Sequence, residues 1–209
     1  MQEPASLKIN KIFWSIQGEG LRAGVPSIFI RLSGCSLKCT YCDSKETWTK
    51  EKFLDQSQII GSVESLRNEF PQSQIVITGG EPLEQDVSNL ISHLKTRQFF
   101  VSIETNGNHF NALSVDWWTV SPKDVNDFFI HPKLSAEINE LKLVVTPRLS
   151  LARIEAFRNL GDHFPIFLQP QHGDAEGMEK TFNLYQECQK GNIENIRLGF
   201  QLHRFYHID

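Results

Sequence analysis

Three cysteines, Cys35, Cys39 and Cys42, lie within one eight-residue stretch in the spacing C-x3-C-x2-C. Thiolates are soft ligands that suit zinc, copper(I) and iron–sulfur clusters. A structural zinc site takes four closed ligands, usually as two pairs, and the remaining cysteine, Cys188, stands alone near the other end of the chain. Three cysteines on a four-iron cluster leave one iron open to a small molecule. The spacing therefore predicts a reactive iron–sulfur cluster.

The cysteines directly follow an apolar run at 28–32, one of several expected strands that alternate with segments of helical periodicity. The expected strands are 12–16, 28–32, 74–78, 99–104, 117–120, 140–145, 165–168 and 195–200. The expected helices are 54–70, 87–94, 150–160 and 178–190. This alternation indicates βα units and a parallel sheet. About six units are too few for an eight-fold barrel, so we expect an α/β fold with an incomplete TIM-type barrel. The chain, 1–209, is expected to be a single domain in which 121–139 is a short helix or a loop.

Polar and glycine residues gather where the expected strands end. Gly79-Gly80-Glu81-Pro82 follows one strand, and a glycine pair also suits an ordinary tight turn. Glu104, Ser121 and Gln169 stand at or directly after the ends of three others. In parallel α/β folds, ligands bind at the carboxyl edge of the sheet. We therefore expect the active face along this edge.

Arg31 interrupts the apolar run at 28–32 and has two interpretations. A buried guanidinium needs an anionic partner. That partner is either a nearby Asp or Glu of the chain itself or an anionic group on a bound ligand. The sequence alone leaves both alternatives open.

The composition excludes several classes of protein. The net charge of −4 and the pI near 6.0 give no indication of a nucleic-acid partner. No apolar run approaches the roughly 20 residues that a membrane span needs, and the N-terminus lacks the pattern of a secretory signal. Clustered thiols then favour the reducing cytoplasm, where disulfides are rare.

The cysteine spacing, with the aromatic Tyr41 before the last cysteine, resembles the radical S-adenosylmethionine (radical SAM) enzymes. The Gly79-Gly80-Glu81-Pro82 turn looks like the glycine motif with which those enzymes bind the methionyl amino group of their cofactor. Further motifs narrow the resemblance to the 7-carboxy-7-deazaguanine synthase family. They are Ser15-Ile16-Gln17-Gly18-Glu19-Gly20, the run at 24–32, Cys42-Asp43-Ser44 with Thr47-Trp48, and Ser121-Pro122-Lys123.

The resemblance implies a radical ring contraction in the queuosine and deazapurine pathway. The family converts 6-carboxy-5,6,7,8-tetrahydropterin to 7-carboxy-7-deazaguanine with loss of ammonia. A reduced 4Fe–4S cluster splits S-adenosylmethionine to give a 5′-deoxyadenosyl radical, which abstracts hydrogen from the substrate and later recovers it. The resemblance also implies Mg²⁺, a flavodoxin-type reductant and a homodimer.

Residue roles follow from the same resemblance. The cluster ligands are Cys35, Cys39 and Cys42. The cofactor is expected to contact Tyr41, Cys42, Asp43, Gly80, Glu104, Ser121, Pro122, Lys123 and Gln169, with Glu104 at the ribose. The pterin is expected to contact Ile16, Gln17, Gly18, Arg31 and Thr78, with Arg31 at its carboxylate. For Glu104 a helix cap or a surface carboxylate is the alternative.

Ser44 occupies the position where the family often has a threonine that binds magnesium, and the serine keeps the oxygen donor. A helix or turn cap is the alternative for this residue. Three other functions remain as alternatives for the whole chain. They are an activating enzyme for glycyl-radical proteins, a non-catalytic iron–sulfur carrier and a zinc-binding module; a carrier would normally ligate all four irons with cysteine.

Overall fold

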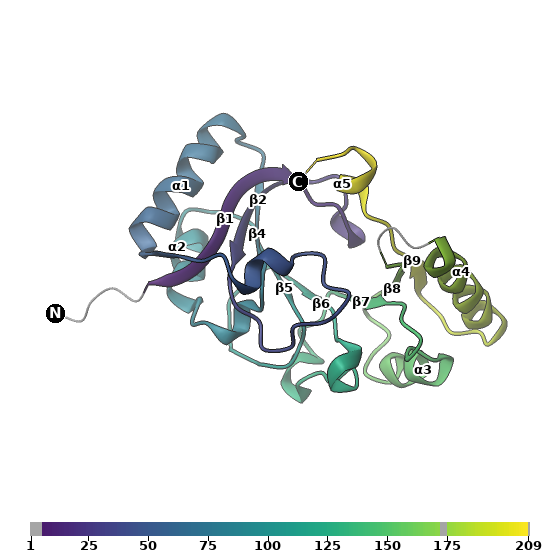
Figure 1. The fold of residues 1–209 in the computed structure, drawn as a ribbon. Coiled ribbons are helices and arrows are strands. Elements are labelled where there is room, and N and C mark those ends of the chain that lie inside the picture. Colours follow the sequence, from purple (N-terminus) through teal and green to yellow (C-terminus); the bar gives the residue numbers. More distant parts are fainter. Residues whose placement is uncertain (1–5, 172–174, 209) are drawn as a thin grey trace.

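The computed structural model describes residues 6–171 and 175–208, and in them the chain forms one nine-stranded sheet (Figure 1). The sheet order is β3-β1-β2-β4-β5-β6-β7-β8-β9. β1 pairs antiparallel with β2 and β3, whereas every pairing from β2 to β9 is parallel. β3 and β9 form the two edges, so the described strands do not close a barrel. This confirms the predicted open α/β barrel.

The elements have the following bounds. The strands are β1 (Leu7–Ile16), β2 (Pro26–Leu32), β3 (Lys52–Leu54), β4 (Gln74–Gly79), β5 (Val101–Thr105), β6 (Trp117–Val120), β7 (Glu140–Val144), β8 (Ile166–Gln169) and β9 (Ile196–Leu198). The helices are α1 (Gln56–Glu69), α2 (Ser88–Thr96), α3 (Leu151–Arg158), α4 (Ala175–Lys190) and α5 (Leu202–Phe205). Single turns of 3-10 helix occur at Gly20–Arg22, Lys45–Trp48, Pro82–Glu84, Asp124–Asn126 and Pro132–Leu134.

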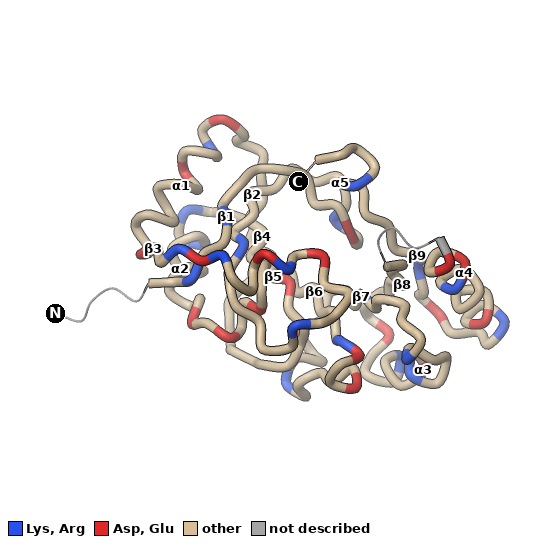
Figure 2. Tube along the Cα trace, viewed as in Figure 1, with Lys and Arg blue, Asp and Glu red and all other residues tan. Residues whose placement is uncertain are grey.

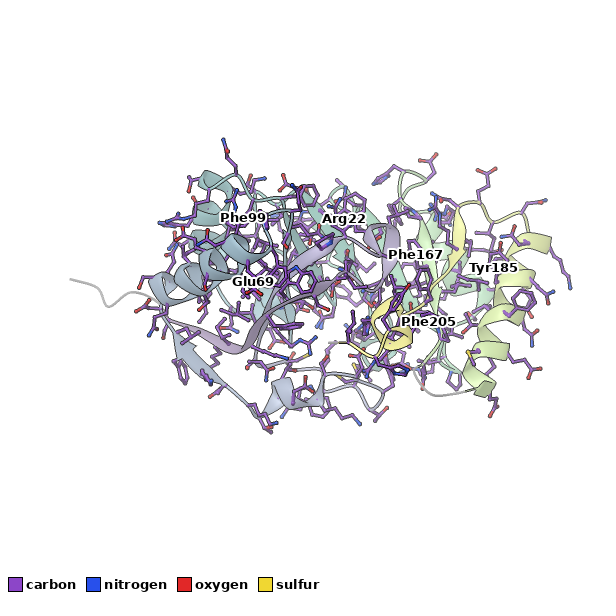
Figure 3. The ribbon with its side chains drawn as sticks, turned by 90° about the horizontal axis from the view of Figure 1, so that it is seen from above. Arg22, Glu69, Phe99, Phe167, Tyr185 and Phe205 are labelled. Carbon is purple, nitrogen blue, oxygen red and sulfur yellow. The ribbon has the colours of Figure 1, made fainter. Side chains whose placement is uncertain are left out.

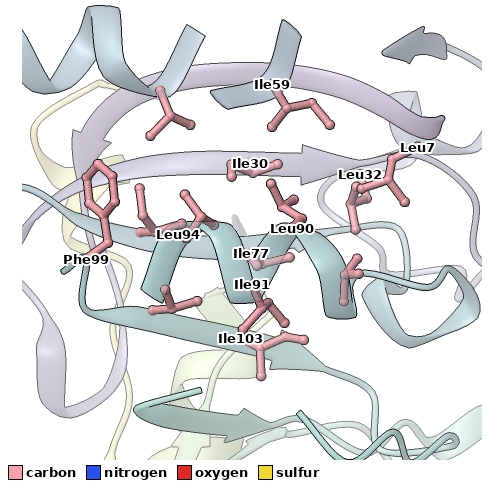
Figure 4. Packing of buried hydrophobic residues seen from close by; sticks show 14 of the residues in the cluster. Leu7, Ile30, Leu32, Ile59, Ile77, Leu90, Ile91, Leu94, Phe99 and Ile103 are labelled. Carbon is pink, nitrogen blue, oxygen red and sulfur yellow. The ribbon is translucent and has the colours of Figure 1, made fainter. Parts of the chain in front are cut away.

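One face of the sheet is apolar because alternate residues of each strand point to the helices. Ile30, Ile77 and Ile103 lie beside one another across β2, β4 and β5 and are fully buried. Leu90 and Leu94 of α2 belong to the same core (Figure 4). A second core, under α3 and α4, surrounds β7 and β8. These two cores hold the strands that carry the site.

The intervening residues point to the opposite face, and many of them are polar. Arg31 of β2 pairs in register with Thr78 of β4, and Glu104 follows on β5. Farther along the sheet come Lys142 on β7 and Gln169 on β8. The same alternation that buries isoleucines under the helices therefore turns a row of polar side chains towards the inside of the open barrel.

Several boundaries differ from the sequence expectation. The helix expected at 54–70 begins at Gln56, because Asp55 forms a capping box with Gln58 and residues 52–54 pair with β1 instead. The stretch 121–139 contains two 3-10 turns. The last strand is three residues long, and α5 after it was not predicted.

Charges of both signs are interspersed along the helices and loops (Figure 2). Neither sign is confined to one part of the chain in that view, in agreement with the small net charge. None of the helices in the described ranges is long and apolar enough to cross a membrane.

Candidate active site

A single pocket on the polar face, at the carboxyl ends of the strands, brings together almost all of the predicted site residues. The members that line it are Ile16, Gln17, Gly18, Arg31, Cys35, Cys39, Tyr41, Cys42, Asp43, Ser44, Thr78, Gly80, Glu104, Ser121, Lys123 and Gln169. Within the described chain, Pro122 is the exception: it is buried and does not line the pocket. Residues more than 150 positions apart in the sequence thus share one cavity.

The cysteine loop is fixed to its surroundings by backbone and side-chain hydrogen bonds. The backbone N–H of Gly34 donates to the carbonyl oxygen of Thr47 at 2.8 Å, which closes the loop at its base. The Tyr41 hydroxyl donates to Asp124 Oδ1 at 2.9 Å and so ties the loop to the turn after β6. All three thiols face the pocket and none forms a disulfide. These hydrogen bonds therefore hold the cysteine loop in one conformation against its neighbours.

The three cysteines of the loop line one pocket, where their thiols are the soft donors that an iron–sulfur cluster takes. Among the residues that the structure describes, no three His, Cys, Asp or Glu side chains could hold a single metal ion. The cysteines of a 4Fe–4S cluster bind different irons and so stand farther apart. Burial raises the pKa of Cys39 and of Cys42, and the nearby Lys123 ammonium opposes this shift. The donor set fits a cluster with three thiolate ligands.

The glycine turn after β4 is anchored by Glu81, whose role sequence reasoning missed. Glu81 is 1% exposed and accepts hydrogen bonds from Thr105 Oγ1 at 2.6 Å and from the backbone N–H of Asn106 at 2.7 Å. It also accepts from the N–H of Leu83. Burial raises the pKa of this carboxyl. Glu81 therefore joins the ends of β4 and β5 beneath the pocket.

Two pocket residues present buried polar atoms that lack a partner in the described structure. These atoms are Asn106 Nδ2 and Gln169 Oε1. A buried amide atom without a hydrogen bond is costly. Both atoms are closed to solvent, and Gln169 Oε1 lies so close to Gly199 that a Cβ atom on that glycine would stand 2.4 Å from it. The two residues line the pocket at the ends of β5 and β8, but these particular atoms do not open into it.

Gln17, Thr78 and Glu104 form a connected group on the pocket wall. Glu104 accepts a hydrogen bond from Gln17 Nε2 at 3.0 Å and another from Thr78 Oγ1 at 2.9 Å. Its side chain is 22% exposed. Neither a helix cap nor an open surface position describes Glu104, so the two alternatives from the sequence do not apply.

Arg31 is half-buried and has a partner within the chain. Its Nη1 lies 3.2 Å from Glu46 Oε1, and its guanidinium lies 5.2 Å from the centre of the Phe13 ring. The side chains of Arg31 and Glu46 are 26% and 38% exposed, so the pair is partly open to solvent. The ion-pair alternative therefore holds, and Arg31 also lines the pocket, whereas Glu46 does not.

Ser44 precedes the 3-10 turn Lys45–Trp48, yet its side chain makes no capping hydrogen bond there. Its hydroxyl instead donates to Asp43 Oδ1 at 3.1 Å, on the pocket wall. Thr47 Oγ1 donates to the Ser44 carbonyl oxygen and supplies the local turn contact. The cap alternative for the Ser44 side chain therefore does not apply to this turn.

A charged group also lines the pocket around Lys142, a residue to which the sequence analysis assigned no role. Lys142 forms ion pairs with Glu19 at 2.6 Å and with Glu104 at 3.6 Å. Gln201 Nε2 donates to Glu19 Oε1 at 2.7 Å, and His203 packs against Gly18. Seen from above, the C-terminal segment with Phe205 crosses over the middle of the molecule (Figure 3). The lysine between the apolar residues Leu141 and Leu143 of the expected strand at 140–145 was the available signal.

The fold and the site together define an open α/β barrel enzyme with a three-cysteine cluster loop facing a polar pocket. A family model described as the radical SAM superfamily matches residues 29–167. The 7-carboxy-7-deazaguanine synthase of Escherichia coli K12 is 38% identical over 96% of this chain and 98% of its own length. The enzyme of the same name from Aquifex aeolicus is 32% identical over 96% and 93%. The chain belongs to the radical SAM superfamily and, within it, to the 7-carboxy-7-deazaguanine synthase family.

The solved structures agree with this assignment. The crystal structure of QueE from Escherichia coli superposes with a TM-score of 0.74 at 30% sequence identity, over 95% of both chains. The match extends beyond the residues of the family model to almost the whole chain. The predicted fold class and family are therefore confirmed.

Proposed function

We propose that this radical SAM enzyme converts 6-carboxy-5,6,7,8-tetrahydropterin to 7-carboxy-7-deazaguanine with loss of ammonia, in the queuosine and deazapurine pathway. The observation that carries the proposal is the single pocket in which the cysteine loop faces Gln17, Arg31 and Thr78. Relatives that are named for this reaction product match almost the whole length of the chain. A cluster with bound S-adenosylmethionine supplies the radical chemistry, and the protein supplies placement and exclusion of water.

The cofactor side of the pocket follows from the donor set. Cys35, Cys39 and Cys42 would hold the 4Fe–4S cluster and leave one iron open. The backbone of 41–43, the glycine turn at Gly80, and the Ser121-Pro122-Lys123 segment would hold S-adenosylmethionine. Gln169, which lines the pocket at the end of β8, would contribute to the same side. Pro122 would act by shaping the backbone between its two neighbours.

The substrate side of the pocket would be formed by Ile16, Gln17, Gly18, Arg31 and Thr78. Arg31 would bind the pterin carboxylate, because a guanidinium offers two parallel donors to that group. Glu104 bonds to Gln17 and Thr78. This contact favours a place for Glu104 beside the pterin over the ribose position expected from the sequence.

The proposal of the remaining partners rests on membership of the family. Mg²⁺ would bind through Ser44 and substrate oxygens, since magnesium prefers oxygen donors and keeps several waters. A flavodoxin-type protein would reduce the cluster. The free thiols of the loop favour the cytoplasm as the place of action, and a homodimer is expected.

The experiment that tests the function is anaerobic reconstitution with iron and sulfide, followed by assay with the carboxypterin, S-adenosylmethionine, Mg²⁺ and a reductant. The expected result is formation of the deazaguanine product and release of ammonia, without net consumption of S-adenosylmethionine. The matched control is the Cys42→Ala protein carried through the same procedure. Absence of product from the wild-type protein, with hydrogen abstraction from a partner polypeptide, would favour an activating enzyme instead.

A further inference from the structure

Lys142 is a buried cation that forms ion pairs with two carboxylates of the pocket and lies near a third. Its side chain is 9% exposed. Its Nζ donates to Glu19 Oε2 at 2.6 Å and lies 3.6 Å from Glu104 Oε1. Glu140, on the same strand, is the third acidic neighbour. None of the residue roles implied by the family motifs uses this lysine.

The two carboxylates that Lys142 touches are held in fixed directions by other donors. Glu19 also accepts from Gln201 Nε2, and Glu104 accepts from Gln17 and Thr78. Because Glu19 comes from the turn after β1 and Glu104 from the end of β5, Lys142 links two separate walls of the pocket.

Lys142 also acts on the charge state of this pair. Burial is the largest single influence and raises the pKa of Glu19 and of Glu104. The Lys142 ammonium, together with the hydrogen bonds from Gln201 to Glu19 and from Gln17 and Thr78 to Glu104, offsets burial and leaves both pKa values lowered. Burial lowers the pKa of Lys142, but Glu104 and Glu19 together raise it by more. The net shift is upward, so the lysine stays charged. Other charged or titratable groups acting on this group are Arg31, Asp43, Glu140, His203 and Arg204.

We propose that Lys142 is a positioning residue for the substrate: it holds Glu19 and Glu104 as paired, ionised acceptors for the N–H groups of the pterin ring. This inference rests on the proposed function. The amino and ring N–H groups along one edge of a pterin are donors, and an ionised carboxylate is acceptor-only. A protonated carboxyl turns one of its two oxygens into a donor and keeps only the other as an acceptor, so the pair accepts from the pterin edge fully only when both groups are charged.

Without the ammonium, two buried carboxylates would face each other across the pocket. Like charges in a desolvated site raise one another's pKa, and one carboxyl then takes up a proton. As the pH falls through the raised pKa, an acceptor is lost and substrate binding weakens. In the wild-type protein the lowered pKa values keep both acceptors ionised throughout the neutral range.

The test is anaerobic titration of reconstituted protein with the carboxypterin over about pH 6 to 9. Lys142→Met removes the charge and keeps the length, and Lys142→Arg keeps the charge. We expect Lys142→Met to weaken Kd by about 100-fold at the lower pH and to recover in part as the pH rises. Wild type and Lys142→Arg should show flat profiles. Iron content and uncoupled cleavage of S-adenosylmethionine should stay unchanged in all three.

A charge-balanced variant keeps the test decisive if Lys142→Met does not fold. Lys142→Met with Glu19→Gln removes one cation and one anion together, and leaves Glu104 as an unpaired buried carboxyl. Its Kd should again weaken as the pH falls. Wild-type affinity with a flat profile in either variant would overturn the role of Lys142. Failure of the wild-type protein to bind the carboxypterin would instead overturn the proposed function.

Discussion

Gly80 lies against Gly34 so closely that a Cβ atom on Gly80 would stand 1.7 Å from the Gly34 carbonyl oxygen. The backbone N–H of Gly80 donates to the carbonyl oxygen of Leu32, and that of Glu81 donates to Gly34. The glycine turn after β4 is therefore packed directly on the chain that leads into Cys35. The turn supports the cysteine loop in addition to facing the pocket.

We predict that Gly80→Ala displaces the cysteine loop. The backbone of Gly34 has no flexible atom that could move aside, so the added methyl group forces the two segments apart. Iron content after reconstitution should fall severely, and stability should fall by about 1–3 kcal/mol. Gly61→Ala, in α1 with open space around it, is the matched control and should be neutral or stabilising. Full iron content in Gly80→Ala would contradict this account.

The three pocket-facing cysteines should be essential for the cluster, and Cys188 should not. Changing Cys35, Cys39 or Cys42 to Ala should abolish the iron–sulfur absorption, because each removes one of three ligands. Cys188 is fully buried in the second core, where burial raises the pKa of its thiol to about 11. Cys188→Ala should keep the iron and cost roughly 1 kcal/mol of stability. Full iron content in a Cys39→Ala protein would rule out the cluster assignment.

Local signals made the framework of this fold predictable. The apolar runs at 28–32 and 74–78 are long enough to be strands, and polar residues end them, so βα alternation and the active edge followed. The cysteine loop needed only its own spacing. Boundaries were less accurate where pairing decides them: residues 52–54 form β3 only because β1 lies beside them.

The charged group around Lys142 could not be derived from the sequence, because its members meet only in the folded chain. Glu19 and Lys142 are 123 positions apart, and Gln201 is a further 59 positions on. Nothing near Gln201 in sequence distinguishes it from other surface glutamines. An ion pair was one of the two alternatives that the sequence left open for Arg31, but the sequence did not identify the partner. That partner, Glu46, lies in a turn whose position could not be predicted.

We predict a homodimer that covers the β9 edge of the sheet. An open edge with apolar side chains is a liability unless it is covered. Leu198 and Phe200, at the end of β9, are 41% and 54% exposed. Sedimentation at about micromolar concentration should give a dimer, and Leu198→Lys with Phe200→Lys should give a monomer. Phe182→Lys on α4 is the control that should leave the assembly intact; a monomeric wild-type protein would remove this prediction.

Ser44 should matter for the magnesium requirement and not for the cluster. Its hydroxyl faces the pocket beside Asp43 and makes no cap for the turn that follows. Ser44→Ala should therefore weaken the Mg²⁺ dependence of turnover, by roughly 10-fold in the concentration needed, with unchanged iron content. Ser44→Thr retains the oxygen and should behave as wild type. An unaltered magnesium response in Ser44→Ala would exclude the serine as a ligand.

Variants of Arg31 and of Glu46 distinguish a purely structural role of Arg31, in its ion pair, from a role in substrate binding. If Arg31 serves the substrate carboxylate, Arg31→Ala should lower turnover of the carboxypterin by about 100-fold or more. It should keep the cluster and uncoupled cleavage of S-adenosylmethionine. Glu46→Gln frees the guanidinium without removing it, so it should retain turnover. If the arginine serves only the pair, both variants should lose the same small amount of stability, about 1 kcal/mol or less for so exposed a pair. Wild-type turnover in Arg31→Ala with an intact cluster would therefore exclude Arg31 from substrate binding.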